Sequence, residues 1–356
     1  MATVNSPPDT GISTMALTMT VAHLNSFRIL DDPDLQPIDL TNTIHPIFQS
    51  GNWRHTPPNI YQAIAPALRL ASRFITERDF IDWWIKAALG NEVTDPATNR
   101  VYLSHCAANH ENRQDTRYIL TLLARYVHFD FMAQATQVNS YERLEVPAVT
   151  RRDDDPNELK FGARGSTFKV WEQLGLTALV MLHGEFYDFF ATVGQTTPSA
   201  ALVQRVQFNL AQTLVHELAH ALDLMRFANI EEAYYDLDDY LAERGEAWEN
   251  FAFRCRIEEN DDHPSTGAPP LMSVIPRWGM SATQWAYAPA GRWYIAIPMI
   301  WINQWFLTET WNKIQREGKS SIRQPYSRLH ARRLLNDQGW RLDVKPSHVA
   351  TVIRYL

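Results

Sequence analysis

The stretch QTLVHELAHALDL (residues 212–224) places two histidines four residues apart, with a glutamate directly after the first. On a helix, residues four apart share a face, so the imidazoles of His216 and His220 can reach one metal ion. Glu217 lies about 100° further around the helix, where its carboxylate can hold a water molecule beside the ion. The stretch therefore predicts a metal-binding helix. The alternative is a structural helix on which this spacing arose by chance.

The residues around the motif indicate one long helix. Apolar residues recur at helical spacing from Ala200 to Leu224, and Thr197-Pro198-Ser199 marks the start. The other positions close to the three polar residues are uncharged. A buried His-Glu-His group without a partner would be costly, and a bound cation is the simplest compensation.

Two histidines do not complete such a site, because catalytic zinc usually has three protein ligands and one open position. The metzincin pattern needs Gly and His at the third and sixth positions after His220, but Asp223 and Arg226 stand there. The aspzincin pattern needs an Asp after a Gly-Thr step, which is missing downstream. The downstream candidates without a supporting pattern are Asp236, Asp238, Asp239 and His263.

Residues 160–256 resemble the zincin superfamily, and within it the gluzincins, through His216, Glu217, His220 and the acidic stretch that follows. In thermolysin-like gluzincins, a Glu on a second helix is the third ligand, and an Asp four residues later supports the first histidine. The segment GEAWEN (residues 245–250) has Glu246 and Asn250 at that spacing. The resemblance therefore implies His216, His220 and Glu246 as zinc ligands.

The second ligand helix departs from the gluzincin pattern at one position and leaves the third ligand open. Asn250 can accept a hydrogen bond from a ring N–H, but it cannot raise the basicity of the imidazole as a carboxylate would. Glu243 and Glu249 flank Glu246 by about one turn on either side and are alternatives to it. The chain also resembles uncharacterised fungal proteins that contain HELAHA, a likeness that implies no function.

The resemblance implies a zinc-dependent hydrolase that cleaves a peptide or amide bond, with Glu217 as the general base for a metal-activated water. It also implies an edge strand that pairs with an extended substrate, for which LTALVMLHG (residues 176–184) is the candidate. The candidates for the group that stabilises the oxyanion are Tyr234, Tyr235, Tyr287 and Tyr294. Two alternatives stay open: an enzyme acting on a small-molecule amide or lactone, and a non-catalytic binding protein stabilised by metal.

The expected fold is α+β and zincin-like, with a small β-sheet, the active-site helix, a second ligand helix, and further helices at both ends. Residues 1–30 are expected to be flexible, 31–257 to form the core, and 258–356 to form a Trp-rich and basic region that packs on it. Helical spacing predicts helices over 60–89 (with a break near Pro66), 116–134, 200–224 and 237–256. Strands are expected between residues 141 and 186, and a solvated loop from residue 258.

The composition of the 356 residues narrows the function classes. A net charge of -7 without a basic stripe argues against a nucleic-acid binder. No apolar run is long enough for a membrane span, and no signal peptide is recognised. The two cysteines, Cys106 and Cys255, do not make a disulfide framework. The sequence thus predicts a cytoplasmic enzyme with a peptide or small amide substrate and no membrane or nucleic-acid partner.

Three further segments have ordinary structural interpretations. SHCAANH (residues 104–110) lacks a standard ligand spacing, so a second metal site is not expected there. The tryptophans between Trp278 and Trp311 are expected to pack in the core and form a wall over the site. The arginines from Arg323 to Arg333 are expected on a solvated helix face.

Overall fold

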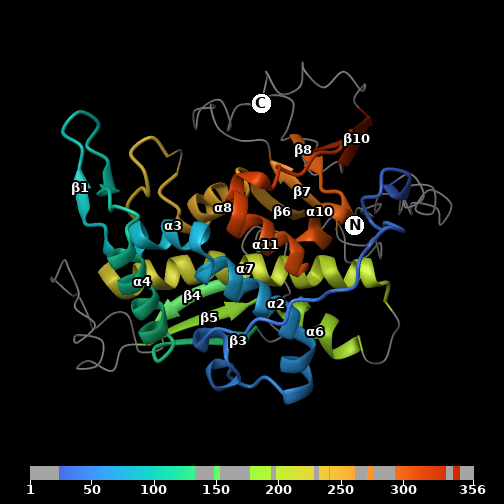
Figure 1. Ribbon diagram of the computed structural model, residues 1–356, viewed down its shortest axis with the longest axis horizontal. Helices are drawn as coiled ribbons and strands as arrows, with labels where there is room; N and C mark the ends of the chain where they lie inside the picture. The colour runs from blue at the N-terminus through green and yellow to red at the C-terminus, as the bar shows by residue number, and fades with distance from the viewer. Residues whose placement is uncertain are drawn as a thin grey trace, which may run out of the picture.

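The computed structural model describes residues 24–132, 148–152, 177–193, 198–227, 232–239, 241–260, 271–275, 293–333 and 340–344. The fold is α+β, with one long helix, α7 (Ala200–Phe227), running through the middle of the molecule (Figure 1). A three-stranded sheet lies on one side of α7, and α8, α10, α11 and a second sheet lie on the other (Figure 1). No helix in the described part of the chain combines the length and apolarity of a membrane span.

The first long helical segment breaks after Thr76 and not at Pro66. It forms α2 (Pro58–Thr76) and α3 (Arg78–Leu89), with Glu77 in an extended conformation between them. Pro66 lacks an N–H and disturbs the hydrogen bonds of its own helix. The side chain of Gln207 compensates, because it accepts from the Ala67 N–H at 2.9 Å and donates to the Ala63 carbonyl at 2.6 Å. The α2 helix therefore continues through Pro66 and is tied to α7.

The helix expected over 116–134 is only partly correct. The structure has α4 (His110–Leu123) followed by a strand, β3 (Val127–Phe131). Buried and partly exposed residues alternate in the first part of VHFDF, where Val127 and Phe129 are buried. This period of two is typical of a strand and not of a helix. A short hairpin of β1 (Glu92–Thr94) and β2 (Val101–Leu103) lies before α4 and projects from the body (Figure 1).

The small sheet expected between residues 141 and 186 is present, and it also includes β3 from the segment expected to be helical. Its strands lie in the order β3-β5-β4, with β5 (Ala178–Leu182) parallel to β3 and antiparallel to β4 (Ala148–Arg152). LTALVMLHG contains β5, which is central and paired on both sides, so the prediction that it is the edge strand is wrong. Within the described residues, β3 and β4 are the outer strands of this sheet.

The two helices that carry the candidate site have different outcomes. The α7 helix begins next to Ser199, whose Oγ accepts from the Leu202 N–H at 3.2 Å, close to the expected start. The α8 helix (Arg244–Phe253) is shorter than the expected 237–256, because Glu243 caps it.

Three shorter elements precede α7. The segment 184–192 forms α6 (Gly184–Thr192), and two short 3-10 turns, η1 (Pro46–Phe48) and η2 (Ser50–Asn52), precede α2.

The C-terminal half contains a second sheet that the sequence did not indicate. Five antiparallel strands lie in the order β10-β9-β8-β7-β6. Their bounds are β6 (Arg256–Asn260), β7 (Leu271–Ile275), β8 (Trp293–Ala296), β9 (Leu329–Arg333) and β10 (Trp340–Val344). The expected loop from residue 258 thus starts inside β6, and Arg332 and Arg333 lie on a strand instead of a helix face.

The main core joins α2, α7, α8 and the C-terminal helices through aromatic side chains. Phe74 of α2 lies 5.4–5.7 Å from the rings of four partners: Trp248, Phe253, Trp305 and Trp311. Trp305 directly follows α10 (Met299–Gln304), and Trp311 lies in α11 (Thr308–Glu317). A 3-10 turn, η4 (Lys319–Ser321), follows α11. Because Trp248 is fully buried in this cluster, α8 is held firmly against the rest of the core.

Candidate metal centre

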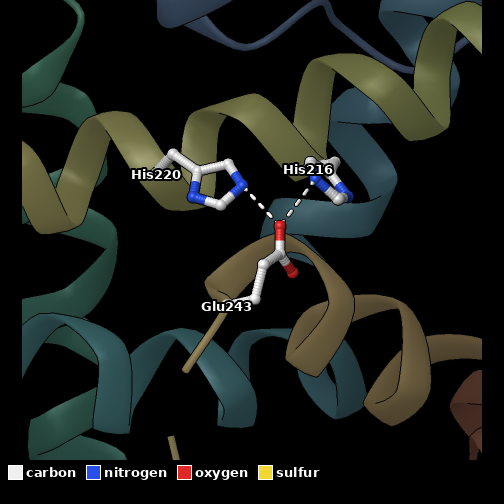
Figure 2. A group of neighbouring side chains, drawn as sticks. All are labelled: His216, His220 and Glu243. Carbon is white, nitrogen blue, oxygen red and sulfur yellow. Dashed lines mark ion pairs between the residues drawn. The ribbon is translucent and has the colours of Figure 1, made fainter. Parts of the chain in front are cut away.

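Three side chains from α7 and the start of α8 converge on one point. The Nε2 atoms of His216 and His220 lie 3.0 and 2.8 Å from the same oxygen, Oε1 of Glu243 (Figure 2). Among the described residues, this is the one group of three or more His, Cys, Asp or Glu residues whose possible ligand atoms lie within 4.8 Å of one another. The helical spacing of the two histidines therefore produces the expected convergence.

Each imidazole is also held by a second carboxylate on its other nitrogen. Nδ1 of His216 donates to Oε1 of Glu249 at 2.7 Å, and the other Glu249 oxygen accepts from the Ile257 N–H at 2.9 Å. Nδ1 of His220 donates to Oε1 of Glu232 at 2.6 Å. When Nδ1 carries the proton, the Nε2 lone pair is available for a metal, so these carboxylates select the tautomer that a metal site requires.

Glu243 is placed by its position at the end of α8. It is the N-cap residue with an extended backbone, and its Oε2 accepts from the Glu246 N–H. A carboxylate at this position satisfies a free backbone N–H and interacts favourably with the positive end of the helix. Because Oε2 is held in this way, Oε1 is turned toward the two imidazoles.

Gly245 allows α8 to approach His216 closely. A β-carbon at this position would lie 2.3 Å from Nε2 of His216 and 2.4 Å from Cε1, far inside contact distance. Gly245 belongs to no recognised motif in the sequence. The one sequence feature that points to it is its position two residues after Glu243, at the start of α8. Any side chain at this position would overlap the His216 imidazole.

The protonation of the cluster is strongly perturbed in the metal-free protein. Burial lowers the pKa of His220, but the contacts with Glu232 and Glu243 outweigh it and raise the pKa to about 10. The pKa of His216 is also raised, since Glu243 and Glu249 outweigh its burial. Burial raises the pKa of Glu243, but the two histidines hold it well below its usual value. The site therefore attracts positive charge, which protons supply when no metal is bound.

Glu246, the residue that the resemblance implied as third ligand, lies elsewhere. It is in the first turn of α8 and its carboxylate forms an ion pair with Arg256 at 2.5 Å. The support of His216 likewise comes from Glu249, three residues beyond Glu246, and not from Asn250. The structure thus brings Glu243 to the two histidines, one of the alternatives that the spacing had left open.

Glu217 follows His216 on α7, and its side chain is buried. The tyrosines proposed for the oxyanion have other contacts. Tyr235 stacks on Trp83 and donates to its carbonyl, while Tyr234 pairs with Tyr102 and lies under Arg100. Tyr294 is in β8, and Tyr287 lies outside the described residues, as does His263.

The other features noted in the sequence do not join this cluster. In the described part of the chain, His105, Cys106 and His110 do not gather into a metal-binding group. His110 begins α4, and both cysteines are free. Trp301, Trp305 and Trp311 are buried in the main core.

The donor set fits a small divalent cation. Three carboxylates contact the two imidazoles directly, so the group carries three negative charges when both histidines are neutral. Two ligand atoms at 2.0–2.1 Å from a tetrahedral ion are about 3.3 Å apart. Oε1 of Glu243 lies 3.0 Å from Nε2 of His216 and 2.8 Å from Nε2 of His220, which is slightly less than this separation. A slight outward rotation of Glu243 therefore makes room for the ion.

Comparisons of the chain with protein-family models, with curated proteins and with solved structures found no match. The function is therefore inferred from the site alone.

Proposed function

We propose that His216, His220 and Glu243 bind a divalent metal ion, and that the protein is a metal-dependent hydrolase of peptide or amide bonds. One observation carries this proposal: both histidines turn Nε2 toward one carboxylate oxygen while each Nδ1 is held by its own separate carboxylate. Ordinary buried histidines do not need this double arrangement, whereas metal ligands commonly have it.

Zinc is the favoured ion. Two imidazole nitrogens and one carboxylate oxygen leave a fourth tetrahedral position open, which is the usual ligand set of a catalytic zinc site. A structural zinc site would instead be closed by four protein ligands, and no fourth candidate lies in the group within the described residues.

The roles of the chain's own residues follow from their positions. A bound zinc ion supplies Lewis acidity and lowers the pKa of a coordinated water. Glu217, next to His216 on α7, takes a proton from the attacking water and delivers it to the leaving group. Glu232 and Glu249 keep the imidazoles oriented and basic.

The test compares purified wild type with Glu217→Gln. Wild type should hold one zinc per chain and cleave members of a diverse peptide library in a reaction that a chelator stops and zinc restores. Glu217→Gln should retain zinc and lose turnover by 100-fold or more, as expected for a general base. Absence of bound zinc in wild type, or full activity of Glu217→Gln, would refute the proposal.

The same assay covers small substrates. If zinc is bound and no peptide is cleaved, amides and lactones are tested next under the same chelator control.

A further inference from the structure

A buried ion pair joins the two helices of the candidate metal centre. Nε of Arg244, the first residue of α8, donates to Oδ1 of Asp223 on α7 at 2.8 Å. The two side chains are 1% and 3% exposed. Asp223 lies three residues after His220, and Arg244 directly follows Glu243.

The pair is a poor source of folding stability. Both terminal nitrogens of Arg244 are buried and make no hydrogen bond within the described residues. Burial raises the pKa of Asp223, and the neighbouring Arg244 charge only partly offsets this rise. Removing two charges from water costs more than such an incompletely bonded pair returns, and apolar residues of similar size are often as stable. A role other than stabilisation is therefore needed to explain it.

The residues around the pair indicate that role. Three consecutive residues contact the metal centre or its supports: Glu243 faces both imidazoles, the Arg244 N–H donates to Oε2 of Glu232 at 2.7 Å, and Gly245 lies on the His216 ring. Since Glu232 holds His220, the backbone of Arg244 supports one ligand while its neighbours supply and contact the others. The side chain of Arg244 adds an ionic link from this turn to α7 that does not involve the histidines.

We propose that the Asp223–Arg244 pair is a positioning device that sets α8 against α7 so that Glu243 reaches the metal. The inference rests on the proposed metal centre and adds two residues to it. Neither of them is a ligand. Without the pair the turn at 243–245 can shift relative to His216 and His220, and a shift of a few tenths of an ångström changes the ligand geometry.

The main experiment replaces both charges at once. The double variant Asp223→Leu, Arg244→Met removes the ion pair while keeping an apolar contact of similar size. We expect the metal-free variant to melt within a few degrees of wild type or above it, and its zinc affinity to fall at least 10-fold, the range seen for residues that orient ligands. The matched control is Asp82→Leu, Arg113→Met, which removes an ion pair of 2.7 Å between α3 and α4. The control should keep its zinc affinity within twofold.

A conservative variant covers the case in which the double variant does not fold. Arg244→Lys keeps the charge but loses the guanidinium geometry, so it should fold, bind Co²⁺ more weakly, and give a visible absorption spectrum shifted from wild type. A purely structural role would leave that spectrum unchanged. Wild-type affinity in the folded double variant, or a wild-type spectrum and affinity in Arg244→Lys, would overturn the positioning role alone. Failure of wild type to bind either ion would overturn the proposed function as well.

Discussion

At the residue scale, the carboxylate of Glu243 has two tasks. One oxygen caps α8 and the other faces both histidines, so the residue couples helix formation to the ligand geometry. Its neighbour Glu246, only three residues away, has an ion pair with Arg256 instead. The two glutamates therefore make a matched pair for mutation.

Glu243→Ala should lose zinc affinity by 100-fold or more, because a ligand is removed, and should lose about 1 kcal/mol of stability from the cap. Glu246→Ala should keep its zinc affinity within a few fold. Zinc titration against a competing chelator measures both. Retained zinc in Glu243→Ala together with loss in Glu246→Ala would return the third position to Glu246.

Gly245→Ala tests the close approach of α8 to His216. The added methyl group meets the imidazole at 2.3 Å, so the ring or the helix start must move. We expect zinc affinity to fall at least 10-fold and the variant to lose about 1–3 kcal/mol of stability, the usual cost of overpacking. Gly51→Ala is the control, since its β-carbon meets nothing within 4 Å. Unchanged affinity in Gly245→Ala would contradict this contact.

At the element scale, the start of α7 and its register were predictable, while the start of α8 was not. The HExxH spacing and the Thr-Pro-Ser start fix α7 locally. The helical pattern over 237–256 does not show that the chain is extended at Glu243, and this one difference moves the converging carboxylate from Glu246 to Glu243. The third ligand depends on how α8 packs on α7, which is tertiary information.

The pairing of the strands into sheets also depends on tertiary contacts. A short apolar run is consistent with β5, but the run alone does not identify the strands that pair with it on each side, β3 and β4. The helical spacing of α4 continues into VHFDF, so the sequence predicts a helix there, although the segment forms β3. The five-stranded sheet is not predictable from periodicity because its strands are only four or five residues long, and β8 pairs with β9 across a connection that contains α10 and α11.

The raised pKa values of the two imidazoles on α7 predict that zinc affinity depends on pH. In the metal-free protein the pKa of His220 is raised to about 10 and that of His216 is raised as well, so metal must displace protons at neutral pH. Zinc affinity should rise by about tenfold or more per pH unit from pH 7 to 9. Affinity that levels off above pH 7, as for a histidine of ordinary pKa, would contradict the coupling to Glu232 and Glu243.

The stability of the metal-free protein should fall as the pH rises, whereas its zinc affinity should rise. A raised folded-state pKa contributes stability that is fully present below the unfolded value of 6.5 and is lost as the pH rises toward about 10. The chelated protein should therefore become less stable between pH 6.5 and 10, as measured by chemical denaturation. The variant His220→Gln should show a weaker decline over this range.

At the scale of the whole molecule, the proposed metal centre lies where α7 meets α8. It links α7, which packs on α2 and the three-stranded sheet, to α8, whose buried Trp248 contacts Phe74 of α2 and Phe253 of α8. A ligand bound between α7 and α8 should therefore stabilise the fold as a unit.

Zinc at 100 times its dissociation constant should add about 2.7 kcal/mol to the free energy of unfolding. Differential scanning calorimetry with and without chelator measures this as a rise in the melting temperature. The variant Glu243→Ala should show a much smaller rise. A zinc effect of equal size in wild type and Glu243→Ala would place the bound ion elsewhere.

The central claim is that His216, His220 and Glu243 hold one metal ion, and crystallography of the zinc-loaded protein at the zinc absorption edge tests it most directly. The expected result is one anomalous peak at about 2.0–2.2 Å from the Nε2 atoms of both histidines and an oxygen of Glu243. A peak ligated by Glu246 in place of Glu243, or no peak between α7 and α8, would contradict it.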